Sequence, residues 1–437
     1  MNYTNNIKKF TILILVLFQF ASITFAQTAK FSEPRQEKLL NGMKLLVWNE
    51  PGAEKITVKL RIHSGSAFDP LGKEGVMALL ADALFPNESQ KEFFAEDLGG
   101  SLDVTSNFDY IQINATGNSD HFLTIVETLA TAVTNPQINK ELTAKVVSAR
   151  LAKVKELEKN PTYVADQAVA KRLFGDFPYG RAQAGTTASL AKIDFADLLF
   201  AKQRLLTADN ATLAIDGNIK PDLAFRAVRR YFGAWEKADK KVPATFRQPD
   251  APKTGLPVFD SPLAKTSEFR FALRGLARND KDFYASRILE NILQNRLQMR
   301  EGKKAFARQD AHFLPSYFIF GVSEWNLQSI KKDGDKIALP ATDDYQNYFL
   351  KAAVKQDEFD KAKNEFISKM NGTDIVDFWL DADTYKLVSA KTEWQAAKNV
   401  TLSDVQRVLE KLQKEAVAFV LVFSGEKAIE KSATSNQ

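Results

Sequence analysis

The stretch that decides the fold is EGVMALLADALF, residues 74–85. Its length and its apolar content predict a short, buried helix. Ala78, Ala81 and Asp82 stand at positions i, i+3 and i+4, so their side chains share one face of that helix. Taken alone, small residues at this spacing indicate a core helix with a closely packed face. The three positions become informative through the sequence that surrounds them.

The chain begins with features that are typical of a signal peptide. Lys8 and Lys9 precede an apolar run at residues 12–20, and TFA at residues 24–26 ends in the small residue that a signal peptidase accepts. The apolar run is short for a membrane span, and no later stretch supplies one. We therefore expect residues 1–26 to be removed and the protein to be exported, periplasmic or associated with the cell envelope of a bacterium. The alternative is an uncleaved N-terminal anchor.

Composition excludes several kinds of site. The sequence has no cysteine, which excludes disulfides, a thiolate metal site and a cysteine nucleophile. A formal charge of +5 is small for 437 residues, and no dense Lys/Arg block with aromatics occurs, so a nucleic-acid partner is not expected. His63, His121 and His312 lie far apart in the sequence, and we interpret each as an ordinary surface or core histidine.

Strand and turn signals begin early in the chain. Residues 39–50 contain the turn pair Asn-Gly, followed by an apolar strand. Residues 56–63 alternate apolar and polar side chains, which predicts a strand with one buried face and one wet face, and places His63 toward solvent. Residues 101–108 and 110–116 are predicted to form paired strands.

The order of elements then recurs in the second half of the chain. A lysine- and proline-rich linker covers residues 237–255. The closing strands of the two halves, residues 211–217 and 419–425, both run into a glycine. We therefore predict an α+β fold class with two homologous domains, residues 27–236 and 256–437, each an antiparallel-rich mixed sheet covered by helices.

Short motifs in both halves occur in a fixed order. They are Leu40-Asn41-Gly42-Met43, Gly65-Ser66, Gly75-Val76, Leu98-Gly99-Gly100-Ser101-Leu102, Phe177-Pro178-Tyr179-Gly180, Gly185-Thr186, Tyr231-Phe232-Gly233-Ala234-Trp235 and Glu358-Phe359-Asp360-Lys361-Ala362-Lys363. Together they resemble the pitrilysin/insulinase-type peptidases, in the short two-domain form of the mitochondrial processing peptidase subunits. The resemblance covers nearly all of the chain after residue 26.

The resemblance implies an inverted zinc motif, His-x-x-Glu-His, on the helix at residues 74–85. Here the first His falls on Ala78, the Glu on Ala81 and the second His on Asp82, while the third ligand position falls near Arg150 or Lys153. A catalytic zinc needs three protein ligands and a general base for its water. We therefore expect no catalytic residue, no metal and no other cofactor in this chain, with zinc only in a partner subunit.

The resemblance also implies where a peptide would lie. The family pairs a substrate strand with the edge strand that contains Asp103, Val104 and Thr105 here. The alternative is an edge strand that Asp103 merely protects from aggregation. In the second domain, Arg296, Arg300 and Phe306 fall at substrate-side positions, with Phe306 where tyrosine is usual.

The expected function is a non-catalytic, pseudo-peptidase subunit that is not an enzyme on its own. It would form the opposite wall of a peptide-holding chamber, in a heterodimer with a zinc-bearing homologue or in a homodimer. Two alternatives stay open. One is an active zinc endopeptidase of the same family, although neither His-x-x-Glu-His nor His-Glu-x-x-His occurs in the sequence. The other is a structural subunit of a membrane-associated assembly.

Overall fold

The computed structural model describes residues 32–238, 246–261, 267–324, 331–333, 336–338 and 350–424. The predicted signal peptide, residues 1–26, lies outside this part of the chain, and so does the middle of the predicted linker at residues 237–255. Within the described residues, no helix has the length and apolar content needed to cross a bilayer.

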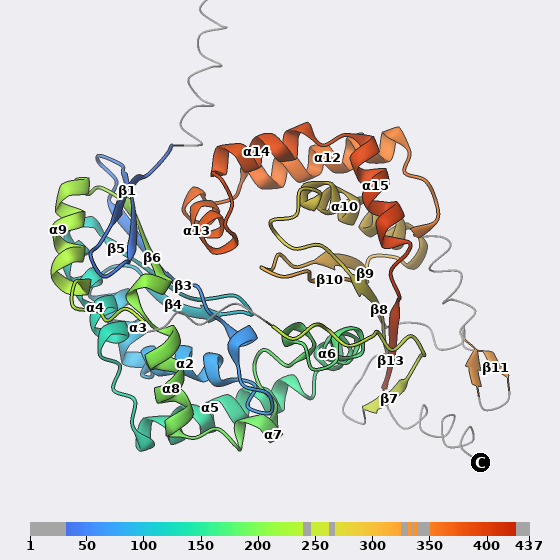
Figure 1. Ribbon diagram of the computed structural model, residues 1–437, viewed down its shortest axis with the longest axis horizontal. Helices are drawn as coiled ribbons and strands as arrows, with labels where there is room; N and C mark the ends of the chain where they lie inside the picture. Colours follow the sequence, from blue (N-terminus) through green and yellow to red (C-terminus); the bar gives the residue numbers. More distant parts are fainter. Residues whose placement is uncertain are drawn as a thin grey trace, which may run out of the picture.

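The helices and strands fall into two halves along the chain (Figure 1). The first half contains β1 (Arg35–Lys38), β2 (Lys44–Asn49), β3 (Lys55–Ile62), α2 (Val76–Leu84), α3 (Glu88–Glu96), β4 (Ser101–Ser106), β5 (Ile111–Asn118), α4 (Phe122–Thr134), α5 (Lys140–Leu157), α6 (Pro161–Phe174), α7 (Thr187–Leu190), α8 (Phe195–Leu205), β6 (Ala211–Gly217) and α9 (Pro221–Phe232). The second half contains β7 (Val258–Ser261), β8 (Glu268–Arg274), α10 (Phe283–Glu301), β9 (Ala305–Gln309), β10 (Tyr317–Ser323), β11 (Lys331–Asp333), β12 (Lys336–Ala338), α12 (Gln356–Asn371), α13 (Ile375–Tyr385), α14 (Ala390–Asn399), α15 (Leu402–Leu412) and β13 (Ala418–Ser424).

Each half builds one mixed sheet. The strand orders are β1-β2-β6-β3-β5-β4 and β7-β13-β8-β10-β9. In both sheets one parallel pair, β2 with β6 or β7 with β13, adjoins a run of antiparallel pairs. Once β1 is set aside, the two orders match strand for strand, from β2 and β7 at one end to β4 and β9 at the other. The predicted α+β fold with two homologous domains is confirmed.

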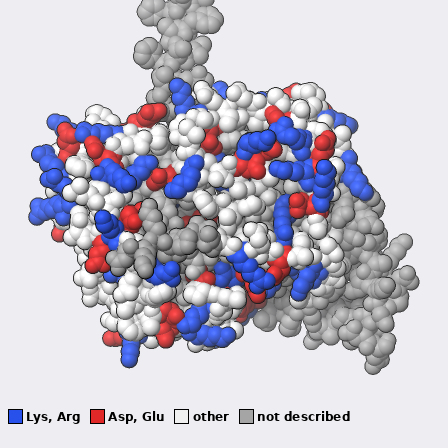
Figure 2. All heavy atoms as spheres, in the orientation of Figure 1, with Lys and Arg blue, Asp and Glu red and all other residues white. Residues whose placement is uncertain are grey.

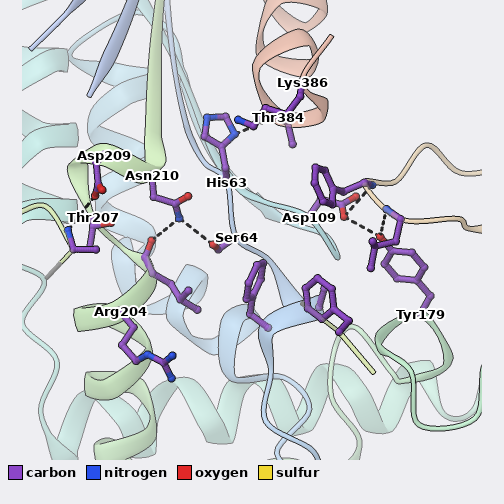
Figure 3. A pocket seen from close by; sticks show the side chains of 17 residues that line it. His63, Ser64, Asp109, Tyr179, Arg204, Thr207, Asp209, Asn210, Thr384 and Lys386 are labelled. Atoms are coloured by element: carbon purple, nitrogen blue, oxygen red, sulfur yellow. Dashed lines mark hydrogen bonds between the residues drawn. The ribbon is translucent and has the colours of Figure 1, made fainter. Parts of the chain in front are cut away.

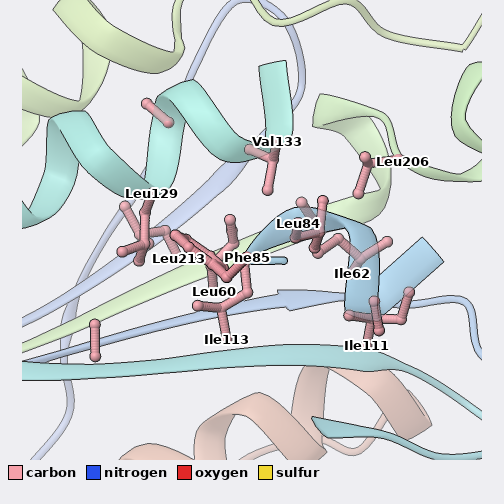
Figure 4. Packing of buried hydrophobic residues seen from close by; sticks show 14 of the residues in the cluster. Leu60, Ile62, Leu84, Phe85, Ile111, Ile113, Leu129, Val133, Leu206 and Leu213 are labelled. Atoms are coloured by element: carbon pink, nitrogen blue, oxygen red, sulfur yellow. The ribbon is translucent and has the colours of Figure 1, made fainter. Parts of the chain in front are cut away.

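The inner face of the first sheet carries the larger core. The apolar positions of β3, which are Ile56, Val58, Leu60 and Ile62, are fully buried there. In Figure 4 the end of α2 and the buried side of α4 cover this face, where Leu84 lies above the strands. The alternation predicted for this strand therefore holds for its apolar side.

The prediction of a wet outer face on β3 is wrong. Lys59 and Arg61 are buried there, and His63, just after the strand, is also shielded from solvent. Helix α13, which comes from the second half of the chain, lies across this face and packs Trp379 and other apolar side chains against it. Its acidic residues meet the cations of the strand, so polar side chains that look solvated in the sequence are in fact paired.

The exchange between the halves is reciprocal. Helix α6 of the first half packs Val169, Leu173 and neighbouring apolar residues on the outer face of the second sheet, against Ile319 and Val420. Figure 1 shows α6 beside β8 and β13, and α13 beside the first sheet. Each sheet therefore has its own helices on one face and a helix of the other half on its second face.

A buried arginine–aspartate pair fixes each exchanged helix. Arg61 of β3 is only 2% exposed, and its guanidinium lies 2.6 Å from the carboxylate of Asp381 on α13. At the matching strand of the second sheet, Arg270 of β8 is 0% exposed and lies 2.7 Å from Asp166 of α6. A buried guanidinium requires such a partner, because desolvation of an unpaired charge costs several kcal/mol. Each pair therefore joins a strand of one half to a helix of the other half, and so helps to fix how the two halves are placed relative to each other.

Removing one carboxylate from these pairs tests this arrangement. We expect Asp166→Asn to lower the free energy of unfolding by about 2–3 kcal/mol, because the lost charge of Asp166 serves both Arg270 and Arg308, although the buried Arg270 keeps its pair with Glu268 of the same strand. Asp381→Asn should cost less, about 1–2 kcal/mol, since water reaches this more exposed carboxylate. Asp222→Asn, which breaks the exposed pair with Arg35, is the matched control and should leave stability close to that of the parent. Equal effects of all three in urea titrations would contradict the proposed role of the buried pairs.

Candidate functional site

Helix α2 is held at its start by a buried carboxylate. Asp69 accepts hydrogen bonds from the backbone N–H groups of Gly75, at 2.7 Å, and Met77, at 2.8 Å. Burial raises the pKa of Asp69 to about 7, although these two hydrogen bonds oppose the shift. Gly75 has φ = 104°, and a Cβ there would lie 3.1 Å from the Cα atom of Gly185. Two of the short motifs, far apart in sequence, thus meet at the beginning of α2.

The three motif positions of α2 face helix α5. Ala78 and Ala81 are buried, and their methyl groups carry no donor or acceptor. The guanidinium of Arg150 contacts both carboxylate oxygens of Asp82, at 2.7 and 2.8 Å, and donates to the backbone carbonyl of Ala78 at 3.1 Å. The structure therefore brings Asp82 and Arg150 together, whereas Lys153 lies exposed one turn further along α5.

These residues do not fit a zinc ion. Two of the three positions on α2 offer only methyl groups, and the remaining carboxylate of Asp82 is engaged by a cation from the helix that should carry the third ligand. Throughout the part of the chain that the structure describes, no group of three or more His, Asp or Glu side chains is arranged to hold a metal ion. The chemical role that these side chains can fill is an ion pair, Asp82 with Arg150, that connects α2 and α5.

A similar bridge joins the corresponding helices of the second half. Arg296 of α10 is buried and forms hydrogen bonds at 2.8 Å with both carboxylate oxygens of Glu358 at the start of α12. The Arg296 side chain therefore serves the contact between α10 and α12. Arg300 lies 3.2 Å from Glu301. The guanidinium of Arg270 lies over the ring of Phe306 on β9, 4.8 Å from the ring centre. The structure does not bring Arg296, Arg300 and Phe306 into one cluster with Asp82.

Strand β4 forms an open edge of the first sheet. Among the strands that the structure describes, it pairs with β5 alone, with Asp103 opposite Asn114 and Thr105 opposite Gln112. The hairpin bond from the N–H of Asn107 to the carbonyl of Tyr110 sets the register, so that Leu102 and Val104 direct their N–H and C=O groups to the open side. Among the described residues these groups bond no other strand; Leu102 is buried and Val104 is half-buried.

The open edge of β4 has a defined end. The side-chain amide of Gln183 donates to the carbonyl of Ser106 at 2.5 Å and so occupies the last outward-facing acceptor. Asp103 and Thr105, whose backbone groups bond β5, expose their side chains beside the edge. Of the three edge residues singled out in the sequence, Val104 thus has outward backbone groups, while Asp103 and Thr105 have exposed side chains.

A cavity of about 260 Å³ lies where the two halves meet (Figure 3). His63 from the end of β3 and Thr384 from α13 form one wall, and their side chains are 3.1 Å apart. On the other side, Tyr179 donates to Asp109 at 3.2 Å, and Asp109 lies 2.6 Å from His312 of the second half. No local sequence pattern predicts the contact between Asp109 and His312. Tyr179 alone belonged to a motif.

Burial shifts the titration of His63. It lowers the pKa of the imidazole, and the charges of Lys386 and Arg61 act in the same direction, whereas Asp383 at 3.3 Å opposes the shift. Burial acts to raise the pKa of Asp383, but hydrogen bonds from His63 and Thr212 outweigh it and hold that pKa below its usual range. Both groups join β3 or β6 to α13, so they titrate at the interface between the halves.

Comparison with protein families gives two adjoining matches. Residues 44–187 match the insulinase family (peptidase family M16), and residues 192–366 match the peptidase M16 inactive domain. A curated relative, an uncharacterized zinc protease from Rickettsia bellii, is 22% identical over 208 residues, which cover 46% of this chain and 50% of that protein. The match therefore spans about half the length of this relative.

Solved structures share the fold over a longer stretch. A protease from Helicobacter pylori is similar with a TM-score of 0.78 at 16% identity, over 90% of this chain and 100% of that chain. The periplasmic protease PqqL from Escherichia coli is similar with a TM-score of 0.67 at 14% identity, over 92% of this chain and 48% of PqqL. At these identities the likeness is one of fold.

Acid should loosen the interface that contains His63. Because the pKa of His63 is lower in the folded than in the unfolded protein, its contribution to stability is present above about pH 6.5 and is lost as the pH falls below that value. The contribution of Asp383, whose pKa is also lowered, is lost only below about pH 4. We therefore expect the free energy of unfolding to decrease between pH 7.5 and pH 5.5.

The decrease should be smaller in His63→Gln, which cannot titrate in this range. His121→Gln removes a half-buried imidazole far from this interface and is the matched control. Urea titrations at the two pH values give the measurement. An identical pH dependence of the parent and His63→Gln would show that His63 does not contribute to it.

Proposed function

The chain belongs to the insulinase (M16) peptidase family, and on this basis we propose that it is a non-catalytic subunit that holds peptide beside a zinc-bearing homologue. The observation that carries the proposal is the contact between Arg150 and Asp82 at the position of the inverted zinc motif. A general base and two of the three ligands are replaced by methyl groups and a paired carboxylate. No hydrolytic step can be built on these side chains.

The open edge of β4 supports a role in holding peptide. The backbone groups of Leu102 and Val104 face outward, as β-augmentation requires, and main-chain hydrogen bonds from such an edge give affinity with little demand on peptide sequence. Asp103 and Thr105 beside the edge would add side-chain contacts. The proposed role is therefore capture of an extended peptide without cleavage.

The proposed partner is a homologous subunit that carries zinc. This chain resembles 48% of PqqL over nearly its own full length, so a protein of the same fold contains a further stretch of comparable size. A separate chain with an intact zinc motif would supply the corresponding second half here. We propose export to the periplasm or cell envelope on the basis of residues 1–26.

An active zinc endopeptidase remains the second candidate, because the curated relative is named as a zinc protease. It would require ligands other than Ala78, Ala81 and Asp82. A structural role in a membrane-associated assembly is a third candidate function for a chain with this fold.

The purified chain should neither retain zinc nor cleave peptide. After incubation with zinc and desalting, elemental analysis should find far less than one zinc per chain, because two of the motif side chains are methyl groups. Fluorescent casein peptides should stay intact with this chain alone and be cleaved when a zinc-bearing homologue is added. Cleavage by the isolated chain that a chelator abolishes would overturn the proposal in favour of the active peptidase.

Peptide binding should depend on one outward N–H group of β4. Val104→Pro removes that donor while the bonds of Asp103 and Thr105 to β5 remain, so we expect at least a tenfold weaker binding of the same labelled peptides. Val104→Thr keeps the N–H group and serves as the matched control. Fluorescence anisotropy measures binding, and circular dichroism checks the fold. Equal binding by both variants would place the peptide elsewhere.

A further inference from the structure

Helix α9 presents an unusual outer face. Leu223, Arg226, Arg229 and Arg230 stand at positions i, i+3, i+6 and i+7, so they occupy one arc of the helix, and all four are exposed. The opposite side of α9 buries Ala224, Val228 and Phe232 in the first core. The exposed arc is not needed for this contact with the core.

The arginines of α9 differ from the others that the structure describes. Elsewhere the guanidinium groups bond carboxylates or backbone carbonyls, often across long separations in the sequence. Among described residues, the exceptions are Arg204, Arg226, Arg229 and Arg230. Arg204 lies beside the ring of Phe200 on α8, so the other three make α9 the helix on which arginines without a carboxylate partner gather. The exposed Asp222 on the same arc bonds Arg35 at 2.7 Å.

Apolar side chains flank this charge. The side-chain amide of Asn41 donates to the carbonyls of Phe232 and Trp235, at 2.8 and 3.0 Å, and so fixes the turn between β1 and β2 at the end of α9. Leu40 at the tip of that turn is 103% exposed, and Leu223 is 44% exposed. We call Leu40, Leu223, Arg226, Arg229 and Arg230 the α9 patch. Figure 2 shows blue side chains projecting at the margin where Figure 1 places α9.

We propose that the α9 patch docks on the surface of a lipid bilayer that contains anionic lipids. Unpaired arginines are attracted to anionic headgroups, and each contributes to surface binding within a Debye length. Leucine side chains that stand free of the protein gain by entering the boundary between headgroups and acyl chains. An acidic protein would satisfy the arginines but leaves the fully exposed Leu40 without a role, which favours the bilayer.

The position of the patch is compatible with the other features of the fold. Helix α9 packs against β2, near the end of the first sheet that is opposite to β4 in the strand order. A protein docked through α9 would therefore keep the open edge of β4 free. The proposal does not rest on the peptide-holding role, because the α9 patch shares no residue with β4 or with the contact between Asp82 and Arg150.

Vesicle binding of charge-reversal variants tests the proposal. Vesicles of phosphatidylcholine with about 30% phosphatidylglycerol would be sedimented with the mature chain, residues 27–437. The triple variant Arg226→Glu, Arg229→Glu, Arg230→Glu should bind at least about 100-fold more weakly than the parent. The matched control reverses three exposed lysines of α5, Lys140, Lys153 and Lys155, and should bind within about threefold of the parent.

Two further comparisons separate charge from insertion. Leu40→Ser should weaken binding by about tenfold and leave its salt dependence unchanged, because it removes apolar contact alone. Vesicles of phosphatidylcholine only should bind the parent weakly. Residues 1–26, which we expect to be removed on export, are left out of every variant, so their apolar run cannot contribute to the binding.

Equal binding of the parent and the α9 triple variant, or equal losses in the α9 and α5 variants, would overturn the proposal. So would tight binding of the parent to soluble polyglutamate together with no binding to the anionic vesicles, because that pattern belongs to an acidic protein partner. Circular dichroism of each variant confirms that the surface changes leave the fold intact.

Discussion

The structure depends on the exchange of helices between its two halves. Each sheet buries one face under helices of its own half and the other face under a single helix from the opposite half, α13 or α6. The exchange brings one buried arginine of each sheet, Arg61 or Arg270, against an aspartate of the incoming helix. Arg270 also pairs with the buried Glu268 of its own strand, so the aspartates of the incoming helices complete the charge pairing of the two sheets. This pairing, together with the apolar contacts of α6 and α13, contributes to how the halves sit together.

A similar arginine–carboxylate pair occurs at the position of the inverted zinc motif on α2. Arg150 joins α5 to α2 through Asp82, and Arg296 joins α10 to α12 through Glu358, so an arginine–carboxylate pair links a matching pair of helices in each half. In the first half this contact occupies the only carboxylate that the motif retains. The Arg150 side chain thus both pairs with that carboxylate and maintains the contact between α2 and α5.

The sequence predicted the architecture better than the contacts. The alternation of β3, the Asn-Gly turn and the recurrence of elements sufficed for two α+β domains, because each of these signals is local. The outer face of β3 was misread, since Lys59 and Arg61 look the same in the sequence whether they meet water or an acidic helix that follows more than 300 residues later. The contact of Asp109 with His312 was missed for the same reason.

The hydrogen bond from Gln183 to the carbonyl of Ser106 has a consequence for recognition. It closes one end of the β4 edge, so a strand added there has a fixed stop and cannot slide past it. Along β4 itself, the outward groups of Leu102 and Val104 and the N–H of Ser106 remain. The register of an added strand would then be set by this chain and not by the sequence of the added strand. Peptides of unrelated sequence would be held in the same position along β4.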